Sequence, residues 1–188
     1  EWGAYVKEPK VIVFREAIRS GDRKHKCITN YGRPSHAKNE AILDGFNETL
    51  FTDESPERNI LEGGGENIII RDGDGRLWTP RLDTQDILPG ITLNTCLRIA
   101  RNLNIPIRSA KIPLDALMSN SDGVVNVTSG ESFIHSLTTP VKAAMFLGTA
   151  TGHELIDFVY DPQTDRLKEL NLKDEVLLRL KEQYDSLT

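Results

Sequence analysis

The sequence predicts a mixed α/β or α+β fold with a substantially mixed sheet. Short β-branched runs alternate irregularly with stretches of helical periodicity along the 188 residues. The regular strand–helix–strand order that is typical of a doubly wound parallel sheet does not appear in this pattern. Hydrophobic residues make up 38% of the chain and charged residues 27%, which fits one globular domain over residues 1–188.

Strands dominate the first half of the chain. We expect a strand over residues 10–15, because KVIVFR is a run of β-branched and apolar residues. A helix is expected over residues 36–45, where apolar residues recur at helical spacing behind Pro34 and Ser35. Further strands are expected over residues 49–52, 59–62 and 67–70, with three glycines between the last two strands and a hairpin turn over residues 72–75.

The second half opens with the clearest helix signal in the chain. Over residues 93–104 the apolar residues Leu93, Cys96 and Ala100 share one face, and Thr92 is a candidate N-cap. The elements expected after it are a strand over 105–112, a short helix over 114–118, a strand over 124–128, a strand ending at 147, a strand over 155–160 and a terminal helix over 173–187.

The charge balance narrows the classes of function. With 28 acidic and 23 basic residues the net charge is −5, and the basic cluster at residues 23–26 is short, so we expect no nucleic-acid partner. No apolar stretch approaches the ~20 residues of a membrane span, so we expect no membrane partner. The two cysteines, Cys27 and Cys96, show neither metal spacing nor a disulfide framework. We therefore expect no metal site and a cytoplasmic location.

Three short segments carry residues suited to cofactor chemistry. Glu62 precedes Gly63–Gly65, whose missing side chains would let the backbone lie against a flat ligand. Residues 88–92, Leu-Pro-Gly-Ile-Thr, lead into the first amides of a helix, which attract phosphate. Lys26 and Tyr31 follow a polar loop. Each segment alone is ordinary, but a lysine, a carboxylate and a phosphate-type helix start together supply what pyridoxal 5'-phosphate (PLP) requires.

The order of these motifs resembles a known family. Lys-x-x-x-Asn-Tyr at 26–31, Asn-Glu-Ala at 39–41, Glu-Gly-Gly-Gly-Glu-Asn-Ile at 62–68 and Leu-Pro-Gly-Ile-Thr at 88–92 are similar to the large domain of the class IV, fold-type IV PLP enzymes. That group includes branched-chain aminotransferases, D-amino-acid aminotransferases and aminodeoxychorismate lyase. The resemblance covers about residues 2–137 and implies the mixed-sheet, pseudo-barrel large domain of these enzymes.

The resemblance implies roles for residues in the first and third of these motifs. Lys26 would form the Schiff base with PLP and move the proton between the substrate α-carbon and the cofactor. Tyr31 would hydrogen-bond the phenolate oxygen of the ring. Glu62 would bind the pyridine nitrogen, and the turn that contains Gly65 and leads to Asn67 would lie beside the ring.

The resemblance also implies two contacts to the cofactor phosphate. Ile91 and Thr92 match the phosphate-binding helix start, through backbone amides and the threonine hydroxyl. The ungapped fit places the second contact at Ser129 and the amide of Gly130, where the family commonly has threonine. An alternative placement at residues 148–150, Gly-Thr-Ala, matches the local motif better but needs an insertion of roughly twenty residues in a connection that is normally short. We expect the first placement.

The function implied by the resemblance is PLP-dependent transamination of an amino acid to its 2-oxo acid. The Glu-Gly-Gly-Gly-Glu-Asn turn and the opening residues 2–5, Trp-Gly-Ala-Tyr, are most similar to the branched-chain group. One alternative is aminodeoxychorismate lyase, which eliminates pyruvate with the same cofactor, and another is a family member that retains the fold without turnover. The family also implies a homodimer. Because the resemblance begins near residue 2, about where the family's smaller N-terminal domain ends, we expect that domain to be absent from this chain.

Overall fold

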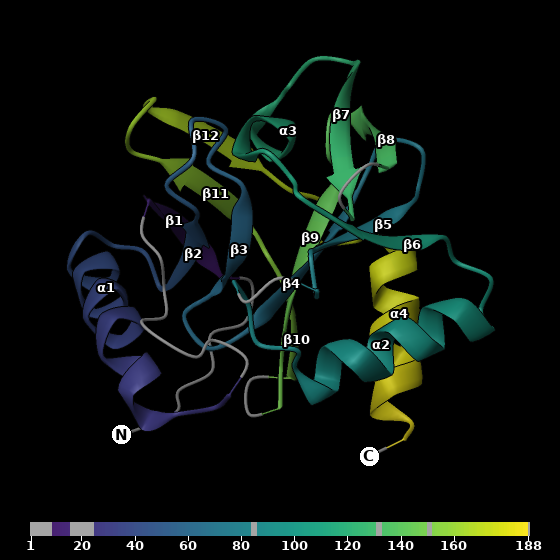
Figure 1. Cartoon of the computed structure of the whole chain (residues 1–188), viewed down its shortest axis with the longest axis horizontal. Helices are drawn as coiled ribbons and strands as arrows, with labels where there is room; N and C mark the ends of the chain where they lie inside the picture. Colours follow the sequence, from purple (N-terminus) through teal and green to yellow (C-terminus); the bar gives the residue numbers. More distant parts are fainter. Residues whose placement is uncertain (1–8, 16–24, 84–85, 131–132, 150–151, 188) are drawn as a thin grey trace.

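Two five-stranded sheets form the centre of the molecule, and a hairpin forms a third, smaller sheet (Figure 1). The computed structural model describes residues 9–15, 25–83, 86–130, 133–149 and 152–187. The first sheet has the order β12-β11-β1-β2-β3, formed by β1 (Lys10–Arg15), β2 (Glu48–Thr52), β3 (Ile60–Gly63), β11 (Phe158–Asp161) and β12 (Arg166–Glu169). The second has the order β10-β9-β4-β5-β6, formed by β4 (Asn67–Arg71), β5 (Leu77–Pro80), β6 (Ile107–Ala110), β9 (Ala143–Gly148) and β10 (Gly152–Leu155). The hairpin consists of β7 (Gly123–Ser129) and β8 (Phe133–Thr139).

Both large sheets are mixed. In the first sheet β1 pairs in parallel with β2 and β11, whereas the β2–β3 and β11–β12 pairs are antiparallel. In the second sheet only the β5–β6 pair is parallel among the described strands. The chain between β1 and β2 forms helix α1 (Gly32–Leu43), since parallel neighbours need a long crossover. The predicted mixed-sheet α/β class is confirmed.

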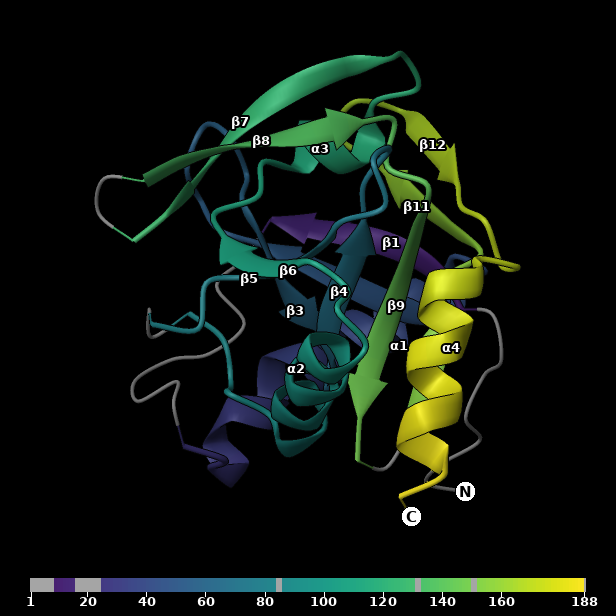
Figure 2. The ribbon, with the colours of Figure 1, turned by 90° about the vertical axis from the view of Figure 1, so that its right-hand side faces the viewer.

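The helices are distributed between the two sheets. A 3-10 turn, η1 (Ile28–Tyr31), leads into α1, which packs on β2. Helix α2 (Ile91–Asn102) packs on β9 and on α4 (Glu175–Asp185), and the short α3 (Leu114–Met118) contacts β12 and β8. In both views α1, α2 and α4 lie toward one end of the molecule and the β7–β8 hairpin lies toward the other (Figures 1 and 2). No helix in the described part of the chain is long and apolar enough to cross a membrane.

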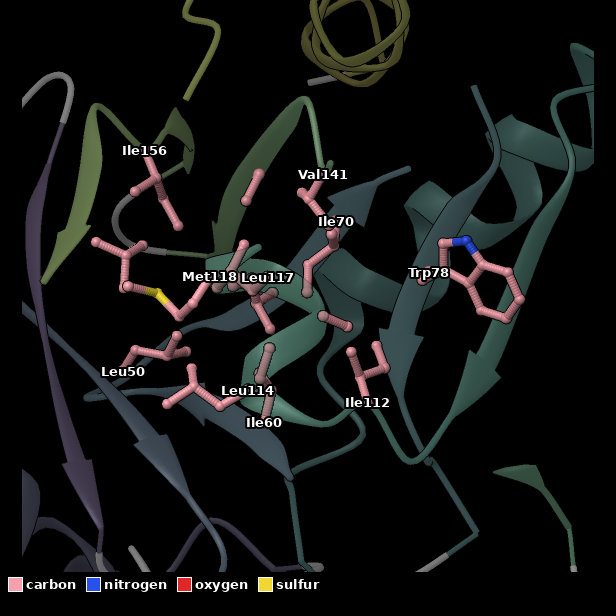
Figure 3. Packing of buried hydrophobic residues seen from close by; sticks show 14 of the residues in the cluster. Leu50, Ile60, Ile70, Trp78, Ile112, Leu114, Leu117, Met118, Val141 and Ile156 are labelled. Carbon is pink, nitrogen blue, oxygen red and sulfur yellow. The ribbon is translucent and has the colours of Figure 1, made fainter. Parts of the chain in front are cut away.

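The two large sheets share one hydrophobic core. Leu50 of β2, Ile70 of β4 and Leu117 of α3 are all buried in one cluster, in which Trp78 also lies (Figure 3). A second cluster fills the space between the second sheet and helices α2 and α4. Burying a large apolar side chain stabilises a fold by about 1.5–3 kcal/mol. The packed sheets therefore hold the strand ends, and the turns that connect them, in defined positions.

Several predicted elements are confirmed in type and place. They are the first strand, the hairpin after residue 71, the helix after residue 90, the short helix α3, the strand that reaches residue 147 and the terminal helix. Helix α1 begins at Gly32, four residues earlier than predicted, and ends at Leu43. Its first turn includes Pro34, where the missing N–H of proline removes no helical hydrogen bond.

Other predictions were wrong. Gly90, not Thr92, is the N-cap of α2, and Thr92 is the second residue of the helix. The strand predicted over 155–160 begins too early, because β10 (Gly152–Leu155), which was not predicted, ends at Leu155 and β11 begins at Phe158. The chain passes from one sheet to the other at Ile156 and Asp157. The strands β8 and β12 were not predicted. Residues 2–5, 23–24 and 150, on which predictions were also made, lie outside the described residues.

Candidate cofactor site

The glycine turn joins the two large sheets. Gly63 ends β3 of the first sheet, and Asn67 begins β4 of the second. The Gly63 N–H donates to the Glu66 carbonyl at 2.7 Å, which closes the turn. A Cβ on Gly63 would lie 2.9 Å from a ring carbon of Phe146, so any other residue there would displace the phenylalanine, whereas a Cβ on Gly65 would meet no atom of the described residues within 4 Å. The turn is therefore closely packed against the core at Gly63 and has free space at Gly65.

Glu62 connects this turn to the segment before α2. Its side chain is 2% exposed, and its Oε2 accepts hydrogen bonds from Asn67 Nδ2 at 3.1 Å and from the Leu88 N–H at 3.2 Å. Asn67 Nδ2 also donates to the Leu88 carbonyl at 2.8 Å. A Cβ on Gly90 would lie 2.2 Å from Asn67 Oδ1, so the close approach requires glycine. The structure thus brings the glycine-turn motif and the Leu-Pro-Gly-Ile-Thr motif together.

The start of α2 carries an unsatisfied hydroxyl. Thr92 is 2% exposed, and its Oγ1 is buried without a hydrogen-bond partner among the described atoms. Gly90 provides no side-chain cap, and Ile91 is 75% exposed. The first amides of a helix have no partner within the helix, and the helix dipole favours an anion there. A buried hydroxyl beside these amides fits the phosphate contact expected at Ile91 and Thr92.

Lys26 and Tyr31 lie on the segment that leads into α1. Lys26 is exposed, two residues before η1, and Tyr31 is half-buried at the N-cap of α1. The Asn30 N–H donates to the Cys27 carbonyl at 3.0 Å, and the buried side chain of Asn30 donates to the His25 carbonyl at 3.2 Å. Hydrogen bonds between residues of this segment therefore fix its backbone conformation. The roles of Lys26 and Tyr31 toward a cofactor stay predictions.

Ser129 and Gly130 lie on the β7–β8 hairpin, which forms a sheet separate from the glycine turn. The Ser129 Oγ is 2.7 Å from His135 Nε2, and the Gly130 carbonyl accepts from Arg81 Nη1 at 3.1 Å. The hairpin lies toward the end of the molecule opposite α2 (Figure 2). None of the described contacts joins Ser129 or Gly130 to Glu62 or Thr92. The structure does not bring this predicted phosphate contact together with the others.

The alternative placement lies closer to the glycine turn. Gly148 is the last residue of β9, and Leu147 before it pairs with Asn67, the first residue of β4. Thr149 follows directly and is exposed. The connection between α3 and β9 contains the whole β7–β8 hairpin. A connection of this length is what the alternative placement requires.

Polar groups that sequence reasoning missed surround the turn. Lys38 of α1 forms an ion pair with Glu48 of β2 at 2.6 Å, and Glu66 within the turn is 7% exposed. Glu66 belongs to the quoted motif, but the motif gave no sign that its carboxyl group is buried. Lys38 and Glu48 meet only because α1 packs on β2. No signal along the sequence pairs these two residues.

A buried thiol of α2 contacts a buried imidazole of β10. Cys96 Sγ lies 3.1 Å from His153 Nε2, and the His153 ring packs on Tyr184 of α4 with centroids 4.2 Å apart. Burial raises the pKa of the Cys96 thiol to about 12. Burial, with a smaller effect of Lys181, lowers the pKa of His153 to about 4. The pair is therefore neutral near pH 7 and acts as packing between α2, β10 and α4.

Comparison with models of known protein families identifies the family of this chain. The sequence model of the amino-transferase class IV family matches residues 4–132. The chain belongs to this family. The resemblance of the motifs is therefore confirmed, and the pairing of Glu62 with the start of α2 lies within the matched range.

Individual relatives point to the branched-chain group. The chain is 30% identical over 123 residues to a probable branched-chain-amino-acid aminotransferase of Staphylococcus aureus, covering 64% of this chain and 34% of that protein. It superposes on the crystal structure of a branched-chain aminotransferase from Thermoproteus uzoniensis with norvaline, with a TM-score of 0.73, 25% identity, and coverage of 97% of this chain and 52% of that one.

A second structure, the PLP form of the branched-chain aminotransferase from Thermobaculum terrenum, superposes with a TM-score of 0.71 at 19% identity. This chain covers 52% of it and 98% of itself. The likeness at this identity concerns the fold alone. The chain thus spans about half the length of the solved structures that it matches and about a third of the Staphylococcus relative.

Proposed function

We propose that this chain is the PLP-binding part of an aminotransferase that converts an amino acid of the branched-chain type to its 2-oxo acid. One observation carries the proposal. The buried Glu62 carboxylate is connected through Asn67 to the segment before α2, where the Thr92 hydroxyl is buried without a partner in the described part of the chain. Asn67 thereby connects the carboxylate that would bind the ring nitrogen to the segment that leads to the hydroxyl that would bind the phosphate.

The residues present fit PLP. Thr92 Oγ1 and the first amides of α2 offer hydrogen-bond donors to a phosphate, and a bound phosphate would satisfy a hydroxyl that is buried with no partner among the residues that the structure describes. The open space at Gly65 allows a flat ring to approach the backbone. For the second phosphate contact we propose Thr149 rather than Ser129. The pairing of Leu147 with Asn67 supports this choice.

Bound PLP supplies an aldehyde carbon for the amino group and a ring that accepts electron density from the substrate α-carbon. Lys26 would hold the cofactor through Nζ. When the substrate amine takes its place, the free Nζ would remove the proton from the substrate α-carbon and return it to the cofactor. Glu62 would keep a proton on the ring nitrogen through its carboxylate. Tyr31 would donate a hydrogen bond to the ring oxygen. Thr92 and the α2 amides would hold the phosphate and so fix the orientation of the ring.

The first test concerns the cofactor and Lys26. We expect the purified chain to bind PLP with a change in visible absorbance, and borohydride reduction to fix PLP on Lys26. Peptide mapping by mass spectrometry identifies the labelled lysine. Labelling of Lys38 or any other lysine instead would remove Lys26 from the proposal.

The second test concerns Glu62. Glu62→Gln should leave PLP binding largely intact but slow removal of the α-proton by roughly 100-fold or more, because a neutral ring nitrogen stabilises the carbanion poorly. Loss of the α-deuterium from labelled leucine measures this step. Glu57→Gln, which changes an exposed carboxylate, is the matched control. Equal rates in the two variants would contradict the role of Glu62.

Turnover separates the alternatives. Amino transfer from leucine, isoleucine or valine to 2-oxoglutarate supports the aminotransferase, whereas pyruvate release from aminodeoxychorismate would support the lyase. PLP binding without either reaction would support a member of the family that does not turn over. We also propose a homodimer, as the family implies, which analytical ultracentrifugation with and without PLP measures directly.

A further inference from the structure

Helix α1 continues the segment in which Lys26 and Tyr31 lie. The 3-10 turn η1 ends at Tyr31, and Gly32, the first residue of α1, has helical backbone angles of φ −61° and ψ −52°, so η1 runs directly into α1. Hydrogen bonds within residues 25–30 fix the backbone on both sides of Lys26. The position of α1 on the sheet therefore decides where Lys26 and Tyr31 lie.

The apolar contact between α1 and the sheet is small. The buried residues of α1 all have small side chains and are Pro34, Ala37 and Ala41. The two largest apolar side chains of the helix, Ile42 and Leu43, are 54% and 86% exposed. Ala37 belongs to a small cluster with Phe51 of β2, separate from the two main clusters. Because small side chains remove little apolar surface from water, a polar contact matters for the position of α1.

The ion pair between Lys38 and Glu48 supplies such a contact. Lys38 Nζ donates to Glu48 Oε2 at 2.6 Å, and the side chain of Glu48 is 8% exposed. Burial would lower the pKa of Lys38, but the charge and the hydrogen bond of Glu48 raise it, and the net direction is upward. The lysine therefore stays charged at neutral pH, and the pair joins α1 to the first residue of β2.

The Glu48 carboxylate also lies against the glycine turn. Strand β2 pairs with β3, with Leu50 opposite Gly63, so the residues before Leu50 lie beside the turn. A Cβ on Gly64 would be 3.1 Å from Glu48 Oε1 and 3.2 Å from Thr49 Oγ1. The Thr49 N–H donates to the same Glu48 oxygen at 3.0 Å, which holds the carboxylate in place. One oxygen of Glu48 therefore faces α1, and the other faces the turn.

We propose that Lys38 and Glu48 are positioning residues. Their ion pair sets the distance between the segment that carries Lys26 and the turn that follows Glu62, so that one PLP molecule can reach both. Neither Lys38 nor Glu48 would touch the cofactor. Both would act through Lys26, and this inference rests on the proposed function.

The first experiment needs no cofactor. Amide hydrogen exchange, followed by mass spectrometry of peptides from α1 and from residues 60–67, measures how often their hydrogen bonds open. In Lys38→Met the exchange rates of both peptides should rise roughly three- to tenfold, because the pair joins the two regions. Lys181→Met is the matched control, since Lys181 pairs with Asp185 on α4, and it should leave both rates unchanged. Unchanged rates in Lys38→Met, or faster exchange of α1 alone, would overturn the proposal.

The second experiment compares two forms of the cofactor. PLP can bond to a lysine through its aldehyde carbon, whereas pyridoxamine 5'-phosphate carries an amine there and cannot. The ratio of the two affinities therefore reports on Lys26, separately from the phosphate and ring contacts. In Lys38→Met the affinity for PLP should fall roughly tenfold or more, and that for pyridoxamine 5'-phosphate should stay within about threefold. Equal losses for both forms would show a merely structural role and would overturn the proposal.

Further variants test the pair itself. Lys38→Arg keeps the charge and should recover the affinity ratio to within about threefold of the unchanged chain. Glu48→Gln removes the other charge but keeps an acceptor for the Thr49 N–H, so it should lower the ratio as much as Lys38→Met, and it provides the same test if Lys38→Met does not fold. The double variant should lose no more than either single variant, because both remove the same contact. Additive losses would overturn the pairing.

The two experiments fail in different ways. If the unchanged chain bound no PLP, the proposed function would fail, and hydrogen exchange would still decide whether the ion pair connects α1 to the glycine turn. If PLP bound but borohydride fixed it on a lysine other than Lys26, the positioning role toward Lys26 would be overturned.

Discussion

Two glycine-containing segments were predicted to contact the cofactor, and their surroundings differ. The turn Gly63–Gly65 joins the two large sheets and is flanked by the buried polar residues Glu62 and Asn67. Gly130 follows a strand of a separate two-stranded sheet, where Ser129 is hydrogen-bonded to a neighbouring histidine. The hairpin also exposes large apolar side chains, among them Val124, Phe133 and Ile134.

The difference between the two segments shows which kind of observation indicates a ligand site. Glycines occur in both segments, so glycine alone does not distinguish them. Polar side chains are buried at a cost unless they are paired, and Thr92 at the start of α2 has its hydroxyl buried without a partner among the described atoms. The cost is recovered when a ligand supplies the partner. The hairpin offers no comparable group in the described residues, because the Ser129 hydroxyl is already paired.

The largest effect that tests this comparison is expected from Gly90→Ala. The new Cβ would lie 2.2 Å from Asn67 Oδ1, so Asn67 must move and its hydrogen bonds to Glu62 and Leu88 must break. We expect the free energy of unfolding to fall by about 1–3 kcal/mol and PLP binding to be lost. Chemical denaturation and PLP titration measure the two effects.

Gly130→Ala is the control for this variant. The backbone of Gly130 has φ +64°, so alanine there costs about 1 kcal/mol, but no atom of the described residues lies within 4 Å of the new Cβ. PLP affinity should not change. A loss of PLP affinity as large as that of Gly90→Ala would reverse the comparison between the two segments.

The support beneath α2 predicts sensitivity to acid. The pKa of His153 is about 4 in the folded chain, chiefly because the ring is buried, against 6.5 in an unfolded chain. The unfolded state therefore binds the proton first, and stability is lost as the pH falls from 6.5 through 4, by up to about 3 kcal/mol. Urea unfolding at pH 7, 5.5 and 4.5 measures the loss. His153→Phe should have a smaller loss over this range, and an identical loss would contradict the assignment.

Thr92→Val separates folding from binding. Valine removes a buried hydroxyl that has no partner in the described structure, so the stability without PLP should be unchanged or higher by up to about 1 kcal/mol. PLP affinity should fall roughly 10- to 100-fold, because a hydrogen bond to a charged group contributes about 1.5–3 kcal/mol. Thermal unfolding without PLP and PLP titration give the two values. A loss of stability without PLP would show that the hydroxyl serves the fold.

The smallest effect is expected from Ser129→Ala. Removing the hydrogen bond to His135 should cost about 1 kcal/mol of stability and leave PLP affinity unchanged. Thr149→Ala should weaken PLP binding instead. A decrease in affinity in Ser129→Ala but not in Thr149→Ala would restore the first placement of the second phosphate contact.

The elements that the sequence predicted correctly are those whose hydrophobic pattern matches the way they are buried in the fold. The run KVIVFR forms a strand in the middle of the first sheet, and the terminal helix has an apolar face that packs on the second. The split between β10 and β11 was missed because Leu155–Tyr160 reads as one continuous run, although Ile156 and Asp157 carry the chain between two sheets. Only packing against two different sheets divides that run.

The motifs of the candidate site were predictable, but their mutual arrangement was not. Glu62, Gly65, Asn67 and Thr92 stand out in the sequence because unusual residue types recur at spacings that resemble a known family. Neither the pairing of Asn67 with the backbone before α2 nor the burial of Glu66 follows from these spacings. Both depend on how β3 and β4 meet at the turn.

The sequence by itself determined the family, the mixed α/β class and the motifs of the candidate cofactor site, because residue identity and spacing are local properties that the chain carries before it folds. Tertiary structure alone decided which motifs lie together. It linked Glu62 to the segment before α2, set the β7–β8 hairpin in a separate sheet, and buried Glu66 beside the glycine turn. Contacts between strands that are distant in the chain arise from packing into a common core, and no short segment encodes them.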